Sequence, residues 1–155
     1  MKHKTKKRDV FTKIIWIAAV VGFSVAVYLT ISKLTHSQLY CTPGLGDCNK
    51  VNATRWSLLW GIPLAAYGAA MYAVILLIQL LKDRVKYIAK YEHLLLFGIS
   101  LFGFLFSLYL TYLEIFVIKA LCQWCVVSAL SITVIFSVSI IRLVKSPANE
   151  THRRN

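Results

Sequence analysis

The sequence predicts an all-α integral membrane protein, a bundle of four transmembrane helices with a short re-entrant or interfacial helix on its outer side. The 155 residues are 58% hydrophobic, and their mean hydropathy is +0.65. Soluble domains are only about half apolar. Four apolar stretches each reach the roughly 20 residues that cross a bilayer core. Most basic residues lie before the first stretch, between the second and third, and near the C-terminus, a pattern that orients membrane helices.

The four predicted spans are 14–34, 62–81, 94–118 and 122–144. The segment 35–61 is too short for another folded domain, which usually needs about 50 residues or more. We therefore expect a basic N-terminal segment 1–13, a membrane domain 14–144 with an outer loop 35–61, and a tail 145–155. The first stretch also resembles a signal peptide. It exceeds the usual apolar core of about 7 to 15 residues and lacks a clear cleavage site, so we interpret it as a retained helix.

The charge pattern predicts the orientation of these spans. Fourteen of the 18 basic residues precede the first span, lie between the second and third, or lie in the last part of the chain from Arg142 onward. The positive-inside rule then places both termini and the middle loop in the cytoplasm. The basic residues behind the net charge of +12 therefore orient the membrane spans, and no nucleic acid partner is expected.

The segment "VNATRWSLLWG", residues 51–61, is too short to span a membrane. Its Trp56 and Trp60 are typical of the interface, where an amphipathic ring lies at the level of the lipid headgroups. We therefore predict a short interfacial helix on the outer side.

All four cysteines fall on the outer side of the predicted topology: Cys41 and Cys48 in the outer loop, Cys122 and Cys125 at the start of the fourth span. An even number of cysteines facing an oxidising compartment predicts disulfide chemistry. The first pair brackets "TPGLGD", whose proline and glycines favour a tight reversal. A disulfide across so short a loop adds only about 2.5 kcal/mol, which suits a bond made and broken repeatedly. A static disulfide is the alternative for this pair alone.

Cys122 and Cys125 form a C-x-x-C motif in the first turn of a predicted helix. The free N–H groups and the positive dipole end of such a turn favour the thiolate, which disulfide exchange requires. The alternative is a metal-binding or assembly membrane protein in which the four outer cysteines are ligands. Structural zinc sites usually have two close pairs, whereas six residues separate Cys41 from Cys48. We predict no metal site. Thiols at the membrane edge suit an electron acceptor dissolved in the bilayer, and a quinone is such a two-electron carrier.

The order of these features resembles the bacterial vitamin K epoxide reductase family. A spaced cysteine pair, a short segment ending in "GIP" and the sequence "YLTYLEIFVIKALCQWC" carry the resemblance, which spans roughly 14–141. It implies four helices around a quinone, menaquinone or ubiquinone, with the 51–61 helix capping the pocket. It also implies electron transfer from a thioredoxin-fold partner. By position, Cys41 faces that partner, Cys48 exchanges with Cys122, and Cys125 lies beside the quinone ring.

The resemblance names further residues on the quinone side. Thr54 stands where the family usually has a serine, and Ala129 where the eukaryotic enzymes have a tyrosine that contacts vitamin K. The alanine favours oxidation of protein dithiols over epoxide reduction. Tyr112 and Phe116 are candidates for the pocket wall, although aromatic residues there more often belong to the interfacial belt or to packing. Glu114 is ionisable at membrane depth, which suggests function, but near the interface we expect its carboxylate to reach water.

The predicted function is that of a membrane thiol oxidase that supports disulfide bond formation. It oxidises an extracytoplasmic thioredoxin-fold dithiol and reduces a membrane quinone. Many bacterial members carry a fused thioredoxin-like domain. No residues remain for one after Val144, so the partner is expected to be a separate protein. Disulfide bond formation protein B has the same chemistry but the opposite order of cysteine pairs. A non-catalytic subunit with static disulfides is the remaining alternative.

Overall fold

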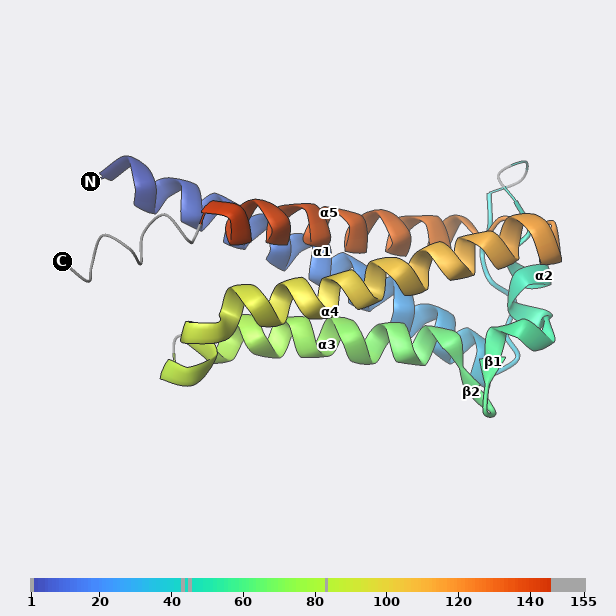
Figure 1. Ribbon diagram of the computed structural model, residues 1–155. Coiled ribbons are helices and arrows are strands. Elements are labelled where there is room, and N and C mark those ends of the chain that lie inside the picture. Colours follow the sequence, from blue (N-terminus) through green and yellow to red (C-terminus); the bar gives the residue numbers. More distant parts are fainter. Residues whose placement is uncertain (1, 43, 45, 83, 146–155) are drawn as a thin grey trace.

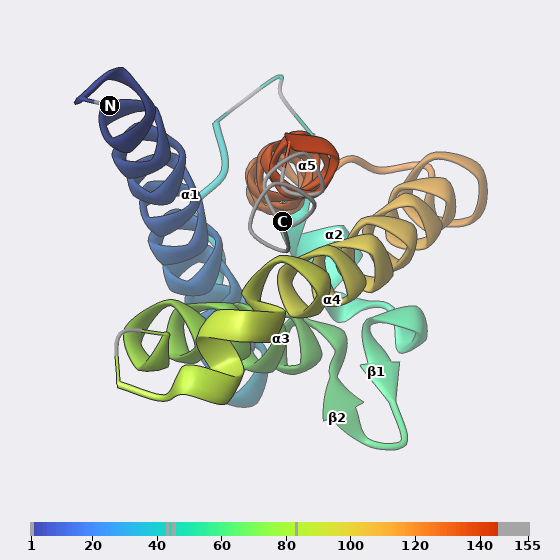
Figure 2. The same cartoon turned by 60° about the vertical axis from the view of Figure 1, so that its left-hand side comes forward.

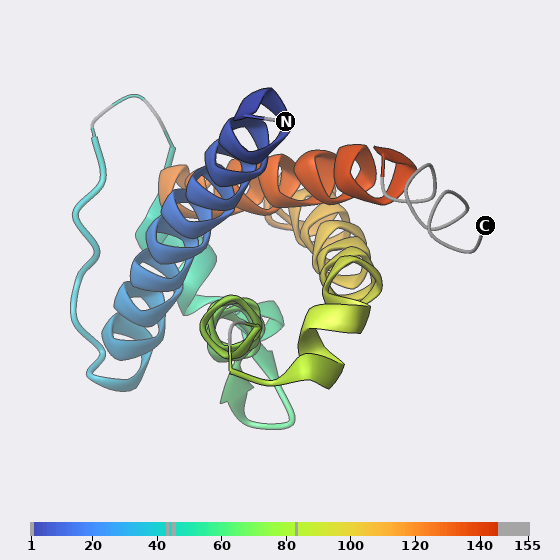
Figure 3. The ribbon, with the colours of Figure 1, turned by 90° about the vertical axis from the view of Figure 1, so that its left-hand side faces the viewer.

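The computed structural model describes residues 2–42, 44, 46–82 and 84–145. Within these residues four long helices lie side by side (Figure 1): α1 Lys2–Leu34, α3 Leu64–Leu81, α4 Lys86–Tyr112 and α5 Gln123–Lys145. Helix α1 packs against α3 and α5, and α4 packs against α5 and α3. Figure 3 shows the four helices arranged around a common centre.

All four helices are long and apolar enough to cross a membrane, over Val10–Leu34, Leu64–Leu81, Lys90–Ile118 and Gln123–Val144. Many apolar side chains face outward, such as Ile17 at 66% and Leu130 at 62% exposed. A lipid-facing surface explains this exposure, since only helices or closed barrels satisfy their backbone inside hydrocarbon. The predicted fold class, an all-α membrane bundle of four spans, is confirmed.

Some predicted boundaries differ from the structure. Helix α1 runs without a break from Lys2, so no change of structure marks the predicted border between 13 and 14. Helix α3 begins at Leu64, after Pro63, rather than at 62. Residues 146–155 of the predicted tail lie outside the described residues.

A short outer helix is present as predicted, but the prediction that it extends over 51–61 is wrong. A short helix α2, Cys48–Ala53, is followed by a 3-10 turn, Arg55–Ser57, and by the strands β1, Leu58–Leu59, and β2, Ile62–Pro63. The strands pair antiparallel, with Leu58 opposite Pro63. Trp60 and Gly61 both have positive φ values, 52° and 81°, which suit a two-residue hairpin turn. The turn reverses the chain within the segment, so a helix cannot continue through it.

The main core lies among the long helices. Its buried members are Ile15, Ala19, Ala26, Tyr72, Ile75, Ile78, Leu96, Ile132, Ile135 and Val138. Gly22 of α1 lies directly against the Tyr72 ring of α3, because an added Cβ would come within 2.3 Å of that ring. The absence of a side chain at this glycine therefore lets two membrane helices approach closely.

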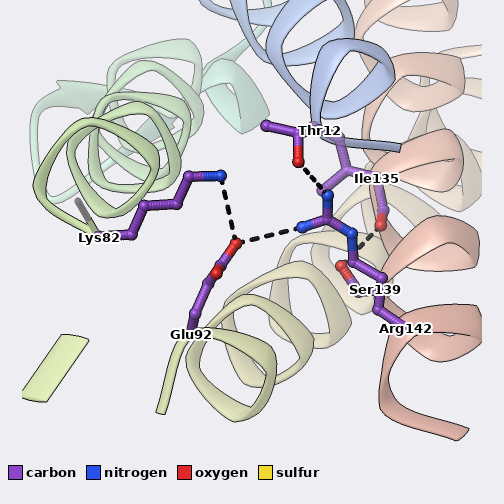
Figure 4. A network of polar contacts seen from close by, with 6 residues as sticks. All are labelled: Thr12, Lys82, Glu92, Ile135, Ser139 and Arg142. Carbon is purple, nitrogen blue, oxygen red and sulfur yellow. Dashed lines mark hydrogen bonds and ion pairs between the residues drawn. The ribbon is translucent and has the colours of Figure 1, made fainter. Parts of the chain in front are cut away.

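A charged network joins the four helices at the end of the bundle opposite the cysteines (Figure 4). Glu92 of α4, only 8% exposed, accepts a hydrogen bond from Arg142 of α5 at 3.1 Å. Lys82, which follows α3, lies 3.7 Å from the same carboxylate, and Arg142 also donates to Thr12 of α1. A buried charge is tolerated when opposite charges and hydrogen bonds surround it. The network therefore holds the helices together at this end.

Candidate functional site

The structure brings all four cysteines to one end of the bundle, the end that carries α2 and the connection from α4 to α5 (Figures 1 and 2). Cys41 and Cys48 form a disulfide, with their Cα atoms 6.2 Å apart. Cys122 and Cys125 are free thiols. Cys48 and Cys122 are 0% and 1% exposed and belong to one buried cluster, against which Cys41 and Cys125 pack.

A backbone hydrogen bond aligns the two buried cysteines. The Asp47 N–H donates to the Leu121 carbonyl at 3.0 Å, and each of these residues directly precedes a cysteine, Cys48 and Cys122. The Asp47 carboxylate also accepts from the Lys50 N–H at 2.9 Å and so caps α2 at its N-terminus. This cap is typical of aspartate. The pairing therefore places a cysteine of the outer loop beside the first cysteine of the C-x-x-C motif.

The two residues between Cys122 and Cys125 bind the chain on both sides of Cys41. The Thr42 N–H donates to the Gln123 side chain at 3.3 Å, and the Trp124 indole N–H donates to the Tyr40 carbonyl at 2.9 Å. The Trp124 ring also makes an edge contact with Tyr28 of α1, with centroids 5.4 Å apart. Gln123 and Trp124 were not predicted as site residues, and no local sequence pattern marks them.

We expect Gly46→Ala to slow electron exchange between the two cysteine pairs by tenfold or more. A Cβ at Gly46 would come within 2.2 Å of the Leu121 carbonyl oxygen, so the loop must move away from the motif and the Asp47 hydrogen bond must break. Each increase of about 1.4 kcal/mol in the activation free energy of exchange slows its rate about tenfold. Single-turnover exchange followed by acid quench and thiol alkylation measures the effect.

Gly44→Ala is the matched control for this change. Gly44 also has a positive φ, +90° against +129° at Gly46, so both substitutions strain the backbone. No atom outside its chain neighbours lies within 4 Å of the Cβ position at Gly44. Equal slowing by the two variants would show that backbone strain, not contact with Leu121, causes the effect.

Cys122 is the N-cap of α5 rather than a member of its first turn, which corrects the prediction. The helix begins at Gln123, and the Cys122 sulfur accepts a hydrogen bond from the Cys125 backbone N–H at 3.4 Å. The hydrogen bond with the Cys125 thiol lowers the pKa of Cys122 most, and backbone N–H groups of Cys125 and Trp124 lower it further. Burial and the Glu114 carboxylate oppose these effects, but the pKa remains below the ordinary thiol value. Cys122 is therefore the cysteine of this pair suited to attack a disulfide.

The pH dependence of alkylation tests this hydrogen bond. In the Cys125→Ser variant the hydroxyl still donates to Cys122, whereas in Cys125→Ala the donor is lost. A lowered thiol pKa means that the reactive thiolate forms at lower pH, so the midpoint of Cys122 alkylation should lie at higher pH in the alanine variant. Both variants also carry Cys41→Ser and Cys48→Ser, so that no disulfide partner remains for Cys122, and they are labelled with iodoacetamide. Identical midpoints would contradict the assignment of the Cys125 side chain as the donor.

Glu114 is buried beside the motif, so the expectation that its carboxylate reaches water is wrong. Its exposure is 5%, and its Oε2 accepts a hydrogen bond from the Cys122 N–H at 3.2 Å. A π-helical segment, Leu113–Ile118, carries it inward and ends at Lys119 in the left-handed conformation. Such π-helical turns are frequent at functional sites. The prediction assumed an uninterrupted α-helix there, and the π-helical turn changes which residues face inward.

An apolar cavity of about 140 Å³ lies beneath the cysteines, roughly ten times the space that one water molecule needs. Cys48, Cys122 and Cys125 line it, together with the predicted Thr54 and Ala129 and with Glu114. Most other lining side chains are apolar and come from all four long helices. Such a cavity with a few polar groups is typical of a small-molecule site.

Tyr112 and Phe116 do not line this cavity, which corrects their predicted placement on its wall. They are 55% and 64% exposed, and their rings pack on each other with centroids 4.9 Å apart. The inward stripe of α4 contains Gly103, Phe106, Ser107, Leu110 and Thr111, the i, i+3, i+4, i+7, i+8 pattern of one helix face. Tyr112 falls outside this stripe.

A quinone fits the residues of this cavity. Its walls are mainly apolar, and both thiols of the motif lie on them, within the space that a quinone ring would enter. The described residues contain no group of three or more His, Cys, Asp or Glu side chains that could hold a metal ion. The Cys41–Cys48 disulfide also leaves only two of the four cysteines as free thiols.

The sequence matches the family model of the vitamin K epoxide reductase family over residues 13–140, which is most of the chain. The matched range contains the four cysteines, Glu114 and the four apolar helices almost in full. Members of that family are oxidoreductases with a membrane disulfide-bond redox function. The chain therefore belongs to the vitamin K epoxide reductase family and is a membrane oxidoreductase.

Proposed function

We propose that this protein oxidises the dithiol of a thioredoxin-fold partner at the outer face of the bacterial inner membrane and transfers the electrons to a membrane quinone, menaquinone or ubiquinone. The oxidised partner then introduces disulfide bonds into other proteins. One observation carries the proposal: the buried Cys48 of an outer disulfide lies in one cluster with the C-x-x-C thiols, and that motif lines an apolar cavity.

The exposure of the two outer cysteines supports the proposed order of thiol exchange, from the partner to Cys41 and Cys48 and then to Cys122. Cys41 is half-buried and Cys48 is fully buried, so a folded partner reaches Cys41 first. Its thiolate attacks Cys41, displaces Cys48 and forms a mixed disulfide, which the second partner thiol resolves. Cys48 then attacks Cys122 of an oxidised inner pair, and Cys125 leaves as a thiolate. Attack of Cys41 on Cys48 restores the outer disulfide and leaves Cys122 and Cys125 reduced.

One arrangement of the cysteines is expected at the end of this transfer. The outer pair is a disulfide and the inner pair is a dithiol, so two electrons reside on the pair that lines the cavity. A bound quinone supplies the two-electron acceptor there. The chain itself supplies Cys125 on the wall of a mainly apolar cavity, and it buries Cys122 away from bulk water. Thiol exchange is thereby separated from competing reactions in solvent.

The proposed role of Thr54 depends on a hydrogen bond that it already makes. Its hydroxyl donates to the Val51 carbonyl at 2.7 Å while the residue lines the cavity. A hydroxyl has one donor hydrogen and two acceptor lone pairs. Thr54 must therefore give up the bond to Val51 before it can donate to a quinone carbonyl. Ala129 leaves space on the same wall, and we propose that it contributes only shape.

The proposed orientation follows the charges of the two ends. Lys13, Lys82, Arg84, Lys86, Lys90 and Arg142 lie toward the end that holds the Glu92 network, and Lys33, Lys50, Arg55 and Lys119 lie toward the cysteines. The positive-inside rule puts the first group in the cytoplasm. The cysteines then face the oxidising compartment, where the partner's disulfide persists.

The test mixes the purified, quinone-loaded protein with a reduced thioredoxin-fold protein and follows quinone absorbance. We expect quinol to form in a one-to-one ratio with oxidised partner. A small dithiol provides a second donor that does not need the outer pair. Metal analysis after mild purification tests the ligand alternative, and unchanged oxidation of both pairs with every donor would support static disulfides. Absence of quinone reduction with both donors would overturn the proposal.

A further inference from the structure

Glu114 lies between the apolar cavity and a second hollow near the cysteines. Its side chain lines the apolar cavity with Cys122 and Cys125, and it also lines a second hollow with Gly46, Lys50, Lys119 and others. Lys50 and Lys119 are exposed, so this second hollow opens at the surface. The same carboxyl group therefore forms part of both walls while it remains 5% exposed.

The carboxyl group lies beside the motif. Its Oε2 accepts from the Cys122 backbone N–H at 3.2 Å, and its side chain lines the same cavity as Cys125. Besides Glu114 itself, the charged or titratable side chains that line the two hollows are Asp47, Lys50, Tyr72, Lys119, Cys122 and Cys125. Among the described residues Glu114 makes no ion pair, since the two recorded salt bridges both involve Glu92.

A buried carboxylate without a cationic partner is costly, and ionisable groups at membrane depth mark proton pathways. Oxidation of the inner pair requires such a pathway. Cys122 reacts as a thiolate and Cys125 carries a proton, so forming their disulfide releases two electrons and one proton. Conversion of a quinone to a quinol takes two electrons and two protons, so one more proton has to enter from outside. Among the described residues that line the cavity, Glu114 is the only carboxylic acid, and the other side chains with exchangeable protons are mainly thiols and hydroxyls.

We propose that Glu114 is a catalytic acid–base residue that takes the Cys125 proton and conducts protons between the outer hollow and the quinone cavity. This inference rests on the proposed function. In the balanced step, the carboxylate removes the proton from Cys125, the Cys122–Cys125 bond forms, and the electron pair passes to the quinone. Glu114 delivers this proton to one quinone oxygen and then takes up a second proton from the outer hollow for the other oxygen.

Glu114→Gln tests the proposal because the amide oxygen still accepts from the Cys122 N–H but the side chain cannot carry a proton. With a small dithiol as donor, quinone reduction should fall by about 100-fold or more, the usual contribution of a positioned acid–base group. Its rate should also lose the pH dependence of the wild type. Glu114→Asp, which retains a carboxylate, should restore part of the rate. Exchange between the two cysteine pairs in the absence of quinone should stay within a few-fold of the wild type.

Glu92→Gln is the matched control, since it neutralises the other buried glutamate at the opposite end of the helices. It should change stability but leave the pH profile of quinone reduction unchanged. A wild-type rate and pH profile in Glu114→Gln would overturn the proposal. Equal loss of cysteine exchange and quinone reduction would also overturn it, because that result indicates a structural role alone.

A measurement without quinone separates this inference from the proposed function. Redox-difference infrared spectra, recorded while diamide oxidises the inner pair, should show a change in a carboxylic acid band that is absent from Glu114→Gln. If the band changes but the wild type never reduces quinone, the proposed function fails and the proton role of Glu114 stands. If quinone is reduced but no carboxyl band changes, the proton role fails and the proposed function stands. If neither is seen, both fail.

Discussion

Cys125→Ala is expected to abolish electron transfer to quinone from every donor, protein or small molecule. In the part of the chain that the structure describes, Cys122 and Cys125 are the only free thiols, and both line the apolar cavity. Cys48 also lines the cavity but is held in the disulfide with Cys41. A single remaining thiol cannot form the inner disulfide, so two electrons cannot leave the pair. Loss of Cys122 should have the same effect.

Quinone absorbance with a small dithiol and with a thioredoxin-fold protein measures this loss. Thermal unfolding and quinone binding of the variant should remain close to those of the wild type, because Cys125 is half-buried and alanine removes only one sulfur atom. Ser137→Ala, which removes a hydroxyl that donates within α5 to Thr133 and is exposed, provides a control on the same helix. Quinone reduction retained by Cys125→Ala would refute the assignment of the inner pair as the electron donor.

Cys125→Ala and Cys48→Ser should accumulate two different covalent species. Without Cys125, the Cys122 thiolate attacks Cys48 in the outer disulfide and releases Cys41 as a thiolate. The thiol of Cys125, which would attack Cys122 and break the new Cys48–Cys122 bond, is absent. The mixed disulfide therefore persists. The Asp47 to Leu121 hydrogen bond favours this link, since it aligns the residues that precede the two cysteines. A bond between the outer loop and the start of α5 should therefore accumulate within the chain.

Without Cys48, the intermolecular bond should accumulate instead. The reduced Cys48→Ser protein is mixed with a single-cysteine thioredoxin-fold protein that is activated as a mixed disulfide with thionitrobenzoate. Cys41 attacks the partner's sulfur and releases the coloured thiolate, and no second outer thiol is present to resolve the new bond. The reduced wild type should release the partner through Cys48. Non-reducing gels and mass mapping of linked peptides distinguish the species. A Cys41–Cys122 link in Cys125→Ala would show that Cys41, not Cys48, exchanges with Cys122. That result would not contradict a quinone-linked oxidase.

The sequence was sufficient for the architecture because the determining quantities are local. Four apolar stretches of adequate length specify four membrane helices, since each helix satisfies its own backbone hydrogen bonds in lipid. An even number of spans between the two cysteine pairs then brings Cys41, Cys48, Cys122 and Cys125 to the same end, as the structure shows. Thr54 and Ala129, which the family resemblance named, line the cavity, and their contact with a quinone stays a prediction.

The sequence did not show where the helical period changes. The segment Leu113–Ile118 is π-helical, so Glu114 turns toward the cysteines, and Tyr112 and Phe116 face outward. A pattern read at 3.6 residues per turn cannot detect one inserted residue among side chains that are nearly all apolar. The turn at Trp60 and Gly61 likewise replaced the expected interfacial helix by a hairpin.

The sequence by itself determined the four spans, their membrane character and the grouping of the cysteines, because apolar length and chain order decide these properties. Only the tertiary structure decided which groups control the thiols. Gln123 and Trp124 bind residues more than 80 positions earlier in the chain, and the Leu121 carbonyl accepts from Asp47. Such contacts depend on how α5, the outer loop and the π-helical turn pack together. No local pattern of residues encodes that packing, so the burial of Glu114 between two hollows became visible only in the folded chain.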